Sequence, residues 1–482
     1  MNTRMIARTI GLVIRIEAVL LLLPAVVGLL YGEHETLYFL LTAALALGLS
    51  LLLTWKKPVN TVFYARDGLL IVAFSWIAMS VLGALPFYLS GEIPSFVDSF
   101  FETVSGFTTT GSSILTDVES LSRGMLFWRS FTHWIGGMGI LVFALAVLPA
   151  AKGEGRAMHI MRAEMPGPSI DKLVPKMRST ALILYAVYLV MTIIEIVLLL
   201  LGGMDLFDSV VNSFGTAGTG GFSVRAESIG AYHSPYAEWV IGIFMLLFGI
   251  NFNIYYLILL GKFKSALKSQ ELRWYLVIVA LATGLIAFNV AHLFDSLGDT
   301  IRAAFFQVSS IITTTGYASL NYDVWPTFSK MVLILLTALG ACAGSTGGGL
   351  KVSRLVMLVK SIGQEIRAMI HPRAVKNIKF EGRPVSKMTL DEVMVFFAAY
   401  VLLLLGSMLV VALDGFDLVS TSTAVLTCVG NVGPGLGMVG PAGNFSEFSI
   451  LSKLVLSFDM LAGRLEIFPM FILFAPRTWK RN

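Results

Sequence analysis

The sequence predicts an all-α integral membrane protein, in which two leading transmembrane helices precede four helix–pore-loop–helix repeats around a central pore. Three observations support this prediction: an apolar composition, a series of apolar runs long enough to cross a bilayer, and four short Thr- and Gly-rich segments that recur along the chain. We expect about ten spanning helices and four re-entrant pore helices, because each repeat contributes two of the former and one of the latter.

The composition excludes a soluble protein. Of the 482 residues, 56% are hydrophobic and only 13% are charged, and the mean hydropathy is +0.80. Soluble proteins carry about a quarter charged residues. The two cysteines, Cys342 and Cys428, do not form a plausible metal site, and they leave a single disulfide as a possibility that nothing in the sequence supports.

Two apolar runs, at roughly 10–31 and 37–55, form a leading segment over residues 1–66. Residues 1–15 are basic, and the run Ala18–Leu30 has no clear small-x-small cleavage site. We therefore expect a first spanning helix that is retained, not a cleaved signal peptide.

Four hairpin units follow, which we place at 67–178, 179–273, 274–390 and 391–482. Their first helices are predicted at about 68–90, 179–203, 274–294 and 391–413. Their second helices are predicted at about 126–150, 236–261, 329–360 and 449–475. A shorter apolar segment, such as Phe96–Phe107, lies between the two helices of each unit, and it is better interpreted as re-entrant than as spanning.

Each short segment leads into a Thr- or Gly-rich motif. The four motifs are Phe107–Ser113, Thr216–Phe222, Ile312–Ala318 and Val429–Gly435, and on their shared glycine they are 109, 96 and 117 residues apart. One such motif alone would be interpreted as a Gly-rich outer turn. Four copies at a period near one hundred residues indicate a duplicated membrane unit that surrounds a pore.

The distribution of Lys and Arg predicts the orientation. With both termini in the cytoplasm, 27 of the 35 Lys and Arg residues lie in inner segments and only six lie in outer loops and outer span ends. This bias follows the positive-inside rule, and all four motifs then enter from the outer face. The net charge of +5 therefore does not indicate nucleic acid, although the basic stretches 151–178 and 351–387 could also dock a cytosolic partner.

The motifs have the chemistry of a cation filter, because backbone carbonyls replace the hydration shell of an ion and glycine permits the dihedrals that aim them inward. The dipoles of the pore helices would favour a cation below the filter. Hydroxyls of Thr108 and Thr313 could add oxygens at the cytoplasmic end, where Ala217 and Gly430 could not. We assign the filter to Thr109, Thr110, Gly111, Gly218, Thr219, Gly220, Thr314, Thr315, Gly316, Asn431, Val432 and Gly433.

The second helix of the third unit is interrupted by the Gly-rich run 340–349. Glycine costs about 1 kcal/mol per residue in a helix interior, so we predict a loop beneath the filter that obstructs the pore, with close helix packing through small residues as the alternative. The predicted gate comprises Gly344, Ser345, Thr346, Gly347, Gly348, Gly349, Lys351 and Arg464.

Several ionisable residues fall in predicted spans, where they are costly. Arg464 could limit cation passage or hold the gate loop through its carbonyls, and pairing with Asp459 or Glu466 is the alternative. We favour helix packing for Glu17 and Glu195 over a proton pathway.

Nothing in the sequence predicts an enzyme or an organic cofactor. The G-x-G-x-x-G match at 435–440 has no strand before it, and in the run 344–351 Leu350 separates the final glycine from Lys351. Any nucleotide dependence would therefore belong to a partner. His133 lies at an outer span end, and we favour an interfacial role over a catalytic one.

The chain resembles the Trk/Ktr/HKT superfamily of potassium transporters over its whole length, and within it the bacterial TrkH/TrkG proteins. Besides the four filter motifs, the resemblance rests on Trp134–Ile140, Ser345–Gly349 followed by Lys351, His371–Val375 and Gly463–Glu466. The two leading helices favour the TrkH type over Ktr-type subunits.

This resemblance implies uptake of K+ across the bacterial inner membrane by a multi-pass protein with both termini in the cytoplasm. It also implies a homodimer in membrane lipid and a cytosolic, TrkA-like regulatory ring that binds nucleotides. One departure limits the expected selectivity: the fourth filter triplet, Asn431–Gly433, has no threonine. A symporter coupled to sodium or protons is the alternative, with Glu17 and Glu195 as its only candidate coupling residues.

Overall fold

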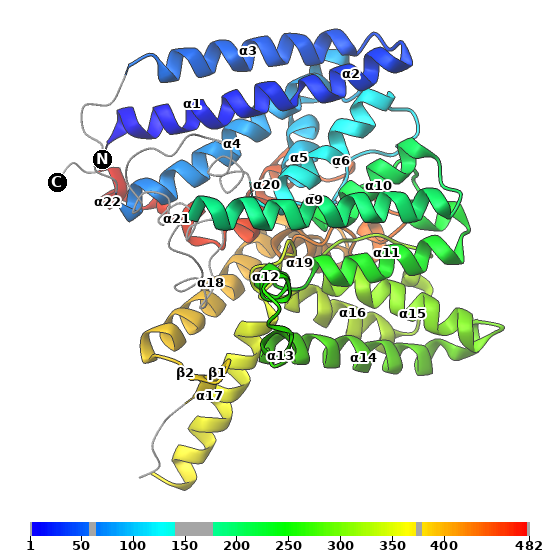
Figure 1. Cartoon of the computed structure of the whole chain (residues 1–482), viewed down its shortest axis with the longest axis vertical. Coiled ribbons are helices and arrows are strands. Elements are labelled where there is room, and N and C mark those ends of the chain that lie inside the picture. Colours follow the sequence, from blue (N-terminus) through cyan, green and yellow to red (C-terminus); the bar gives the residue numbers. More distant parts are fainter. Residues whose placement is uncertain (1, 57–63, 140–176, 373–377, 480–482) are drawn as a thin grey trace.

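The computed structural model describes residues 2–56, 64–139, 177–372 and 378–479. Within these ranges the chain is almost wholly helical, and the only strands are the short antiparallel pair β1 (Lys379–Phe380) and β2 (Arg383–Pro384). Long helices lie side by side, and α1 begins and α22 (Pro476–Trp479) ends on the same side of the bundle (Figure 1). The predicted all-α fold class is confirmed.

The leading segment is a helical hairpin. The first span consists of α1 (Thr3–Leu20) and α2 (Leu22–Tyr31), and α3 (Thr36–Thr54) returns beside it. Ser50 Oγ donates a 2.6 Å hydrogen bond to the carbonyl oxygen of Gly11, and Arg15 Nε donates to Ser50 Oγ at 3.1 Å. The lack of a side chain at Gly11 lets the two helices approach closely enough for these bonds.

Each of the four units contains a first helix, a pore helix and a second helix. The first helices are α4 (Ala65–Ser90), α9 (Met177–Leu201), α14 (Gln270–Val290) and α18 (Lys387–Val411). The pore helices are α5 (Phe96–Phe107), α10 (Leu206–Gly218), α15 (Leu297–Ile312) and α19 (Leu418–Gly430). The second helices begin as α6 (Arg123–Gly137), α11 (Pro235–Phe248), α16 (Thr327–Leu339) and α20 (Ile450–Arg464).

The remaining elements are short or continue a second helix. The continuations are α12 (Phe252–Leu259), α17 (Val352–Ile370) and α21 (Phe468–Phe471), and α13 (Phe263–Leu267) connects α12 to α14. Short 3-10 helices are η2 (Ser228–Tyr232), η3 (Ala291–Leu293), η4 (Tyr322–Val324), η5 (Ala412–Asp414), η6 (Gly437–Val439) and η7 (Ile472–Phe474).

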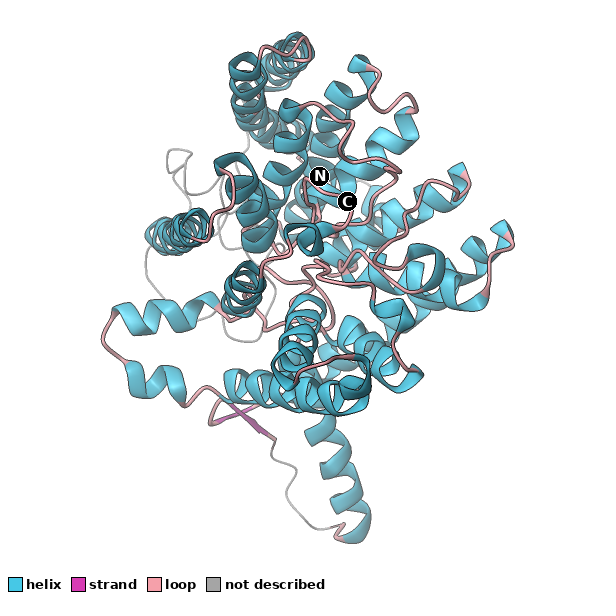
Figure 2. Ribbon diagram, turned by 90° about the vertical axis from the view of Figure 1, so that its right-hand side faces the viewer, coloured by secondary structure: helices cyan, strands magenta, loops and turns pink. Residues whose placement is uncertain are grey.

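The four units close into a ring. Every pore helix packs against both helices of its own unit, and it also packs against the second helix of the preceding unit: α10 on α6, α15 on α11, and α19 on α16. The contact between α5 and α20 joins the first unit to the fourth and completes the circle. In Figure 2 several long helices are seen nearly end-on, and loops run toward the middle of the bundle.

The second helices differ from their prediction, because we expected an interruption only in the third unit. In the second unit α11 and α12 meet at an angle of 88°, and in the fourth unit α20 ends at Arg464 before α21 begins. In the first unit α6 ends at Gly137, and the predicted remainder up to residue 150 lies mostly outside the described residues. Gly137, Gly249, Gly340 and Gly463 lie at or beside these ends, where the absent side chain weakens the helix.

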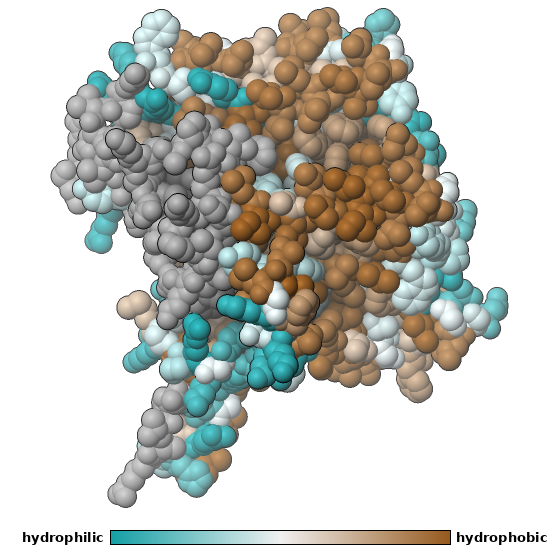
Figure 3. Space-filling model, viewed as in Figure 1, coloured by the Kyte–Doolittle hydropathy of each residue, from teal (hydrophilic) through white to brown (hydrophobic). Residues whose placement is uncertain are grey.

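The bundle presents an apolar surface of the kind that faces lipid. Phe288 on α14, Leu52 on α3 and Leu402 on α18 are 88%, 72% and 68% exposed. A broad hydrophobic area covers the face seen in Figure 3, and hydrophilic side chains gather toward its edges. Six helices among the described residues are long and apolar enough to cross a membrane, and the bent pair α11–α12 makes a seventh. The breaks in the third and fourth units, together with the end of the described range at residue 139 in the first unit, account for the difference from the ten expected.

Candidate functional site

The four pore helices bring their C-terminal ends to the middle of the ring. They contain 12 to 16 residues, so at about 1.5 Å per residue they are shorter than the roughly 30 Å of a bilayer core. Each begins at a polar N-cap, and Ser95, Asp205, Ser296 and Asp417 each accept a hydrogen bond from a backbone N–H of the first turn. The C-terminal ends carry partial negative charge, which favours a cation at the centre.

A left-handed residue stands one or two positions after the last residue of each pore helix. Thr109, Thr219, Thr314 and Asn431 have φ angles of 54°, 56°, 59° and 54°. Two residues later each segment reaches a glycine with positive φ, and Gly111, Gly221, Gly316 and Gly433 have values of 83°, 79°, 85° and 96°. Four different sequences therefore share one backbone conformation. The glycine is required because side chains avoid this region.

The same glycines lie against the neighbouring segment around the ring. A Cβ atom at any of them would collide with the carbonyl oxygen that precedes the equivalent glycine of the next unit. These oxygens belong, in ring order, to Gly220, Thr315, Val432 and Thr110. The contacts run from unit one to two, three, four and back to one, so the four segments surround a common axis.

This pattern corrects the sequence alignment in the second unit. Gly221, and not Gly220, is equivalent to Gly111, so the second segment is Thr219-Gly220-Gly221. Gly218, which we had assigned to the filter, is the last residue of α10, and it corresponds to Thr108. The residues assigned to the other three triplets lie in the segments that form this ring.

The threonine hydroxyls at the base of the segments are engaged with protein atoms. Thr108 Oγ1 donates to the carbonyl oxygen of Val104 at 2.7 Å and lies 2.8 Å from Thr110 Oγ1. Thr313 repeats the arrangement, with its Oγ1 2.8 Å from Thr315 Oγ1. These hydroxyls stabilise the start of the first and third segments, and the equivalent positions in the second and fourth units are Gly218 and Gly430.

Different side chains bridge neighbouring segments. Asn431 Nδ2 donates to Thr110 Oγ1 at 3.0 Å, which joins the fourth segment to the first. Tyr317 Oη, after the third segment, donates to the carbonyl oxygens of Asn212 at 2.8 Å and Phe222 at 3.2 Å in the second unit. The threonine missing from the fourth triplet is thus replaced by an amide that ties two segments together.

The Gly-rich run forms a loop directly beneath the ring, as predicted. It joins α16 to α17 over residues 340–351, and the N–H of Gly348 donates to Thr314 Oγ1 at 2.6 Å. The second unit holds its other side, because the N–H of Phe252 donates to the carbonyl oxygen of Gly344 at 2.9 Å and Thr346 Oγ1 donates to that of Phe248 at 3.2 Å.

Arg464 fastens this loop to the first unit. Its Nη1 donates to the carbonyl oxygen of Thr346 at 2.7 Å, and its Nη2 donates to those of Gly136 at 2.5 Å and Gly137 at 2.7 Å. The last two oxygens belong to the C-terminal end of α6, which attracts a cation. Of the two roles considered for Arg464, the geometry favours holding the loop. Glu466 instead pairs with Arg354 of α17.

A small cavity opens below the loop. It has a volume of about 50 Å³ and is lined by residues that include Trp76, Ser345, Lys351, Arg464 and Glu466. The Lys351 ammonium donates to the carbonyl oxygen of Gly347 in the loop. The cationic side chains of Lys351 and Arg464 therefore both line this cavity.

A buried carboxylate binds the loop near its start and the first turn of the helix that follows it. Glu271, near the start of α14, accepts hydrogen bonds through Oε1 from the N–H of Ala343 at 2.7 Å and from the N–H of Ser353 at 3.2 Å. The second donor lies in the first turn of α17, where a negative charge is stabilised by the helix dipole. No local sequence pattern distinguishes Glu271 from other acidic residues at helix starts.

Other ionisable residues that the sequence analysis considered are also buried. Glu17 and Glu195 are fully buried, and the Glu195 carboxylate lies near the Thr216 side chain of α10. Asp459 Oδ1 accepts from Ser407 Oγ at 2.7 Å. His133 corrects our expectation of an interfacial residue, because it is fully buried behind the second filter segment.

Comparisons with known proteins agree in covering nearly the whole chain. The family model TrkH, described as cation transport protein, matches residues 36–481. The chain is 37% identical to the Trk system potassium uptake protein TrkH of Escherichia coli (strain K12) and 35% identical to TrkG of the same strain, over 100% of each chain. It is also similar to the crystal structure of the potassium transporter TrkH from Vibrio parahaemolyticus, with 34% identity, a TM-score of 0.89 and 100% coverage of both chains.

Proposed function

Because this chain belongs to the TrkH family of cation transport proteins, we propose that it carries K+ into the cell through the ring of four filter segments. The observation that carries the proposal is the closed ring, in which each left-handed glycine lies against the carbonyl oxygen of the next segment. Such a ring offers an ion many carbonyl oxygens and no fixed charge, as a dehydrated K+ requires.

The filter in this proposal is short. It consists of Thr109–Gly111, Thr219–Gly221, Thr314–Gly316 and Asn431–Gly433, with one left-handed glycine in each segment. Potassium enters from the outer face, consistent with the positive-inside distribution of Lys and Arg, so both termini lie in the cytoplasm. The membrane is the bacterial inner membrane, as it is for the family that the sequence resembles.

The loop at 340–351 is the gate. It lies under the ring, and Arg464 and Lys351 place two positive charges beside the exit. At an effective dielectric constant of about 20, a K+ ion about 4 Å from one such charge is disfavoured by about 4 kcal/mol. Ion passage therefore needs the loop and its cations to move aside.

A cytosolic partner sets the gate. The resemblance implies a homodimer of this chain on a TrkA-like ring that binds nucleotides. The helix α17 leads from the loop to a basic segment and projects from the bundle (Figure 1), so force applied to α17 would reach the loop directly.

The filter is tested by measuring K+, Rb+ and Na+ flux into proteoliposomes that contain the purified protein or its Gly316→Ser variant. The variant should lose K+ and Rb+ flux and its preference over Na+, since a side chain there meets both a positive φ and the carbonyl oxygen of Val432. Gly363→Ser is the control, because a side chain on this exposed residue of α17 meets no atom within 4 Å. Unchanged selectivity in Gly316→Ser would show that the filter assignment is wrong.

The gate is tested separately by deleting residues 344–349. Without this obstruction, K+ flux in the absence of any cytosolic partner should rise. Unchanged flux would overturn the gate while leaving the filter assignment intact.

A further inference from the structure

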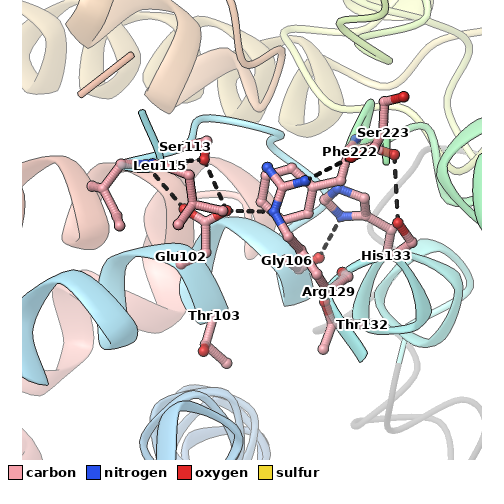
Figure 4. A network of polar contacts seen from close by, with 12 residues as sticks. Glu102, Thr103, Gly106, Ser113, Leu115, Arg129, Thr132, His133, Phe222 and Ser223 are labelled. Carbon is pink, nitrogen blue, oxygen red and sulfur yellow. Dashed lines mark hydrogen bonds and ion pairs between the residues drawn. The ribbon is translucent and has the colours of Figure 1, made fainter. Parts of the chain in front are cut away.

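A buried network of polar side chains lies behind the ring, on the side where the first and second segments meet (Figure 4). Glu102 of α5 and Arg129 of α6 form an ion pair, with 2.6 Å between Oε1 and Nε and side-chain exposures of 0% and 4%. Removing one member of a buried ion pair leaves an uncompensated charge, so such a pair constrains the elements that carry it.

The ion pair reaches the outer ends of both segments. Glu102 accepts hydrogen bonds from Ser113 Oγ and from the N–H of Ile114, each at 3.0 Å, just after the first segment. Arg129 Nη1 donates to the carbonyl oxygen of Ser223 at 3.0 Å, just after the second. The guanidinium carbon also lies 3.6 Å from the ring centroid of Phe222, a cation–π contact.

His133 extends the network toward the base of the ring. Its Nε2 accepts from the N–H of Phe222 at 3.3 Å, so its Nδ1 carries the hydrogen that is donated to the carbonyl oxygen of Gly106 at 2.7 Å. The imidazole occupies the space that a side chain on Gly220 would need. One histidine therefore links the first pore helix to the second filter segment.

The other units have weaker contacts at the same place. Seven residues before the first left-handed residue, the four units carry Glu102, Asn212, Gln307 and Ala424. Gln307 Nε2 donates to Ser319 Oγ at 3.4 Å, and Asn212 Nδ2 donates to Tyr232 Oη at 3.0 Å. Hydrogen bonds to ionised groups are about twice as strong as those between neutral groups, so this position is most firmly held in the first unit.

We propose that Glu102, Arg129 and His133 are positioning residues that keep the first and second filter segments at a set spacing, and that this half of the ring determines the preference for K+ over Na+. The inference rests on the proposed function. A carbonyl ring that cannot contract around a smaller ion favours the larger one. The three side chains resist contraction because they join both segments to α5 and α6 through charged and buried contacts.

The test compares K+ and Na+ flux for the full-length protein and its Glu102→Gln variant in proteoliposomes, together with the melting temperature of each. Glu102→Gln keeps the shape of the side chain and removes its charge. The K+/Na+ flux ratio should fall about tenfold, chiefly because Na+ flux increases. Gln307→Leu at the same place in the third unit is the matched control, and its ratio should stay close to that of the wild-type protein.

Two results would overturn the inference: an unchanged flux ratio in Glu102→Gln, or a proportional loss of both fluxes together with a lower melting temperature, which indicates a merely structural role. If Glu102→Gln does not fold, His133→Leu decides the matter, since it leaves the ion pair in place and removes the bonds to Phe222 and Gly106. An unchanged ratio there would equally overturn it. Absence of K+ flux in the wild-type protein would instead contradict the proposed function itself.

Discussion

The filter ring and the helix breaks beneath it differ in how closely the four units resemble one another. In the ring, four different sequences adopt one backbone conformation, with a left-handed residue followed two positions later by a left-handed glycine. Beneath it, the second helices of units two, three and four all break at similar places, yet the breaks differ: a sharp bend at 249–251, a loop at 340–351 and a short turn at 465–467.

The difference shows where one chain with four unequal repeats can specialise. A ring closes only if each segment presents an equivalent carbonyl oxygen and glycine to its neighbour. The backbone conformation is therefore the same in all four segments, even where Asn431 replaces threonine. The breaks make no such closed circle. One of them can therefore lengthen into a loop, and another can supply the arginine that holds it.

The equivalence of the four segments would be contradicted most clearly if the fourth segment tolerated a side chain at its glycine. Gly433→Ala should reduce K+ flux at least about 100-fold. An alanine there would have a disfavoured φ and would collide with the backbone of the first segment. Flux assays in proteoliposomes check this, with Gly284→Ala in α14, which meets no atom within 4 Å, as the control. Substantial remaining flux would mean that the fourth segment does not line the pore.

The asymmetric region is tested next by Arg464→Ala. This change removes the bonds from Arg464 to Thr346, Gly136 and Gly137 and one positive charge beside the exit. Partner-independent K+ flux should rise about tenfold, with the K+/Na+ ratio unchanged because the ring is intact. Arg273→Ala is the control. Arg273 is exposed, and its guanidinium donates only to the nearby carbonyl oxygens of Lys268 and Ser269 among the hydrogen bonds described. A fall in flux would contradict the holding role of Arg464.

A smaller effect is expected from Glu271→Gln, which weakens the hydrogen bonds to the N–H groups of Ala343 and Ser353 without removing the side chain. Charged acceptors are about twice as strong as neutral ones, so we expect a rise in partner-independent flux of about threefold. The same flux assay measures it. A loss of selectivity in this variant would mean that the loop and the ring are not separable.

The smallest effect concerns a residue outside both regions. Glu92 accepts two hydrogen bonds from Ser122 at the start of α6, and burial raises its pKa above the ordinary value. Because its pKa is raised, the Glu92 carboxyl stays protonated to a higher pH in the folded protein than in the unfolded chain. Stability should therefore fall as pH rises from about 4.3 toward the raised value. Melting temperatures between those limits should decline in the wild-type protein and less so in Glu92→Gln. Parallel curves for the two proteins would rule out this contribution, and neither protein should differ in selectivity.

The pore helices and the loop were within reach of the sequence. The first pore helix was predicted at Phe96–Phe107 and occupies those residues, because its length and polar N-cap are local properties. The break at 340–349 was equally predictable, since the cost of five glycines in a helix does not depend on distant contacts.

Other features were beyond that reach. Three glycines, Gly218, Gly220 and Gly221, lie in or next to the second segment, and spacing alone cannot say which of them is left-handed. Aligning on a Thr or Asn two residues before the glycine would have selected Gly221. Likewise, His133 and Glu102 lie far in sequence from Phe222, so nothing local predicts that they form one network.

The sequence by itself determined an apolar helical bundle, four re-entrant helices, four glycine-bearing motifs and one long interruption, because hydropathy, capping and glycine content act within a few residues. Only the tertiary structure decided which glycine faces the neighbouring segment, how Arg464 and Glu271 hold the loop, and which side of the ring is braced by charge. Those features depend on carbonyl oxygens and side chains that approach from other units, and their positions exist only once the ring has closed.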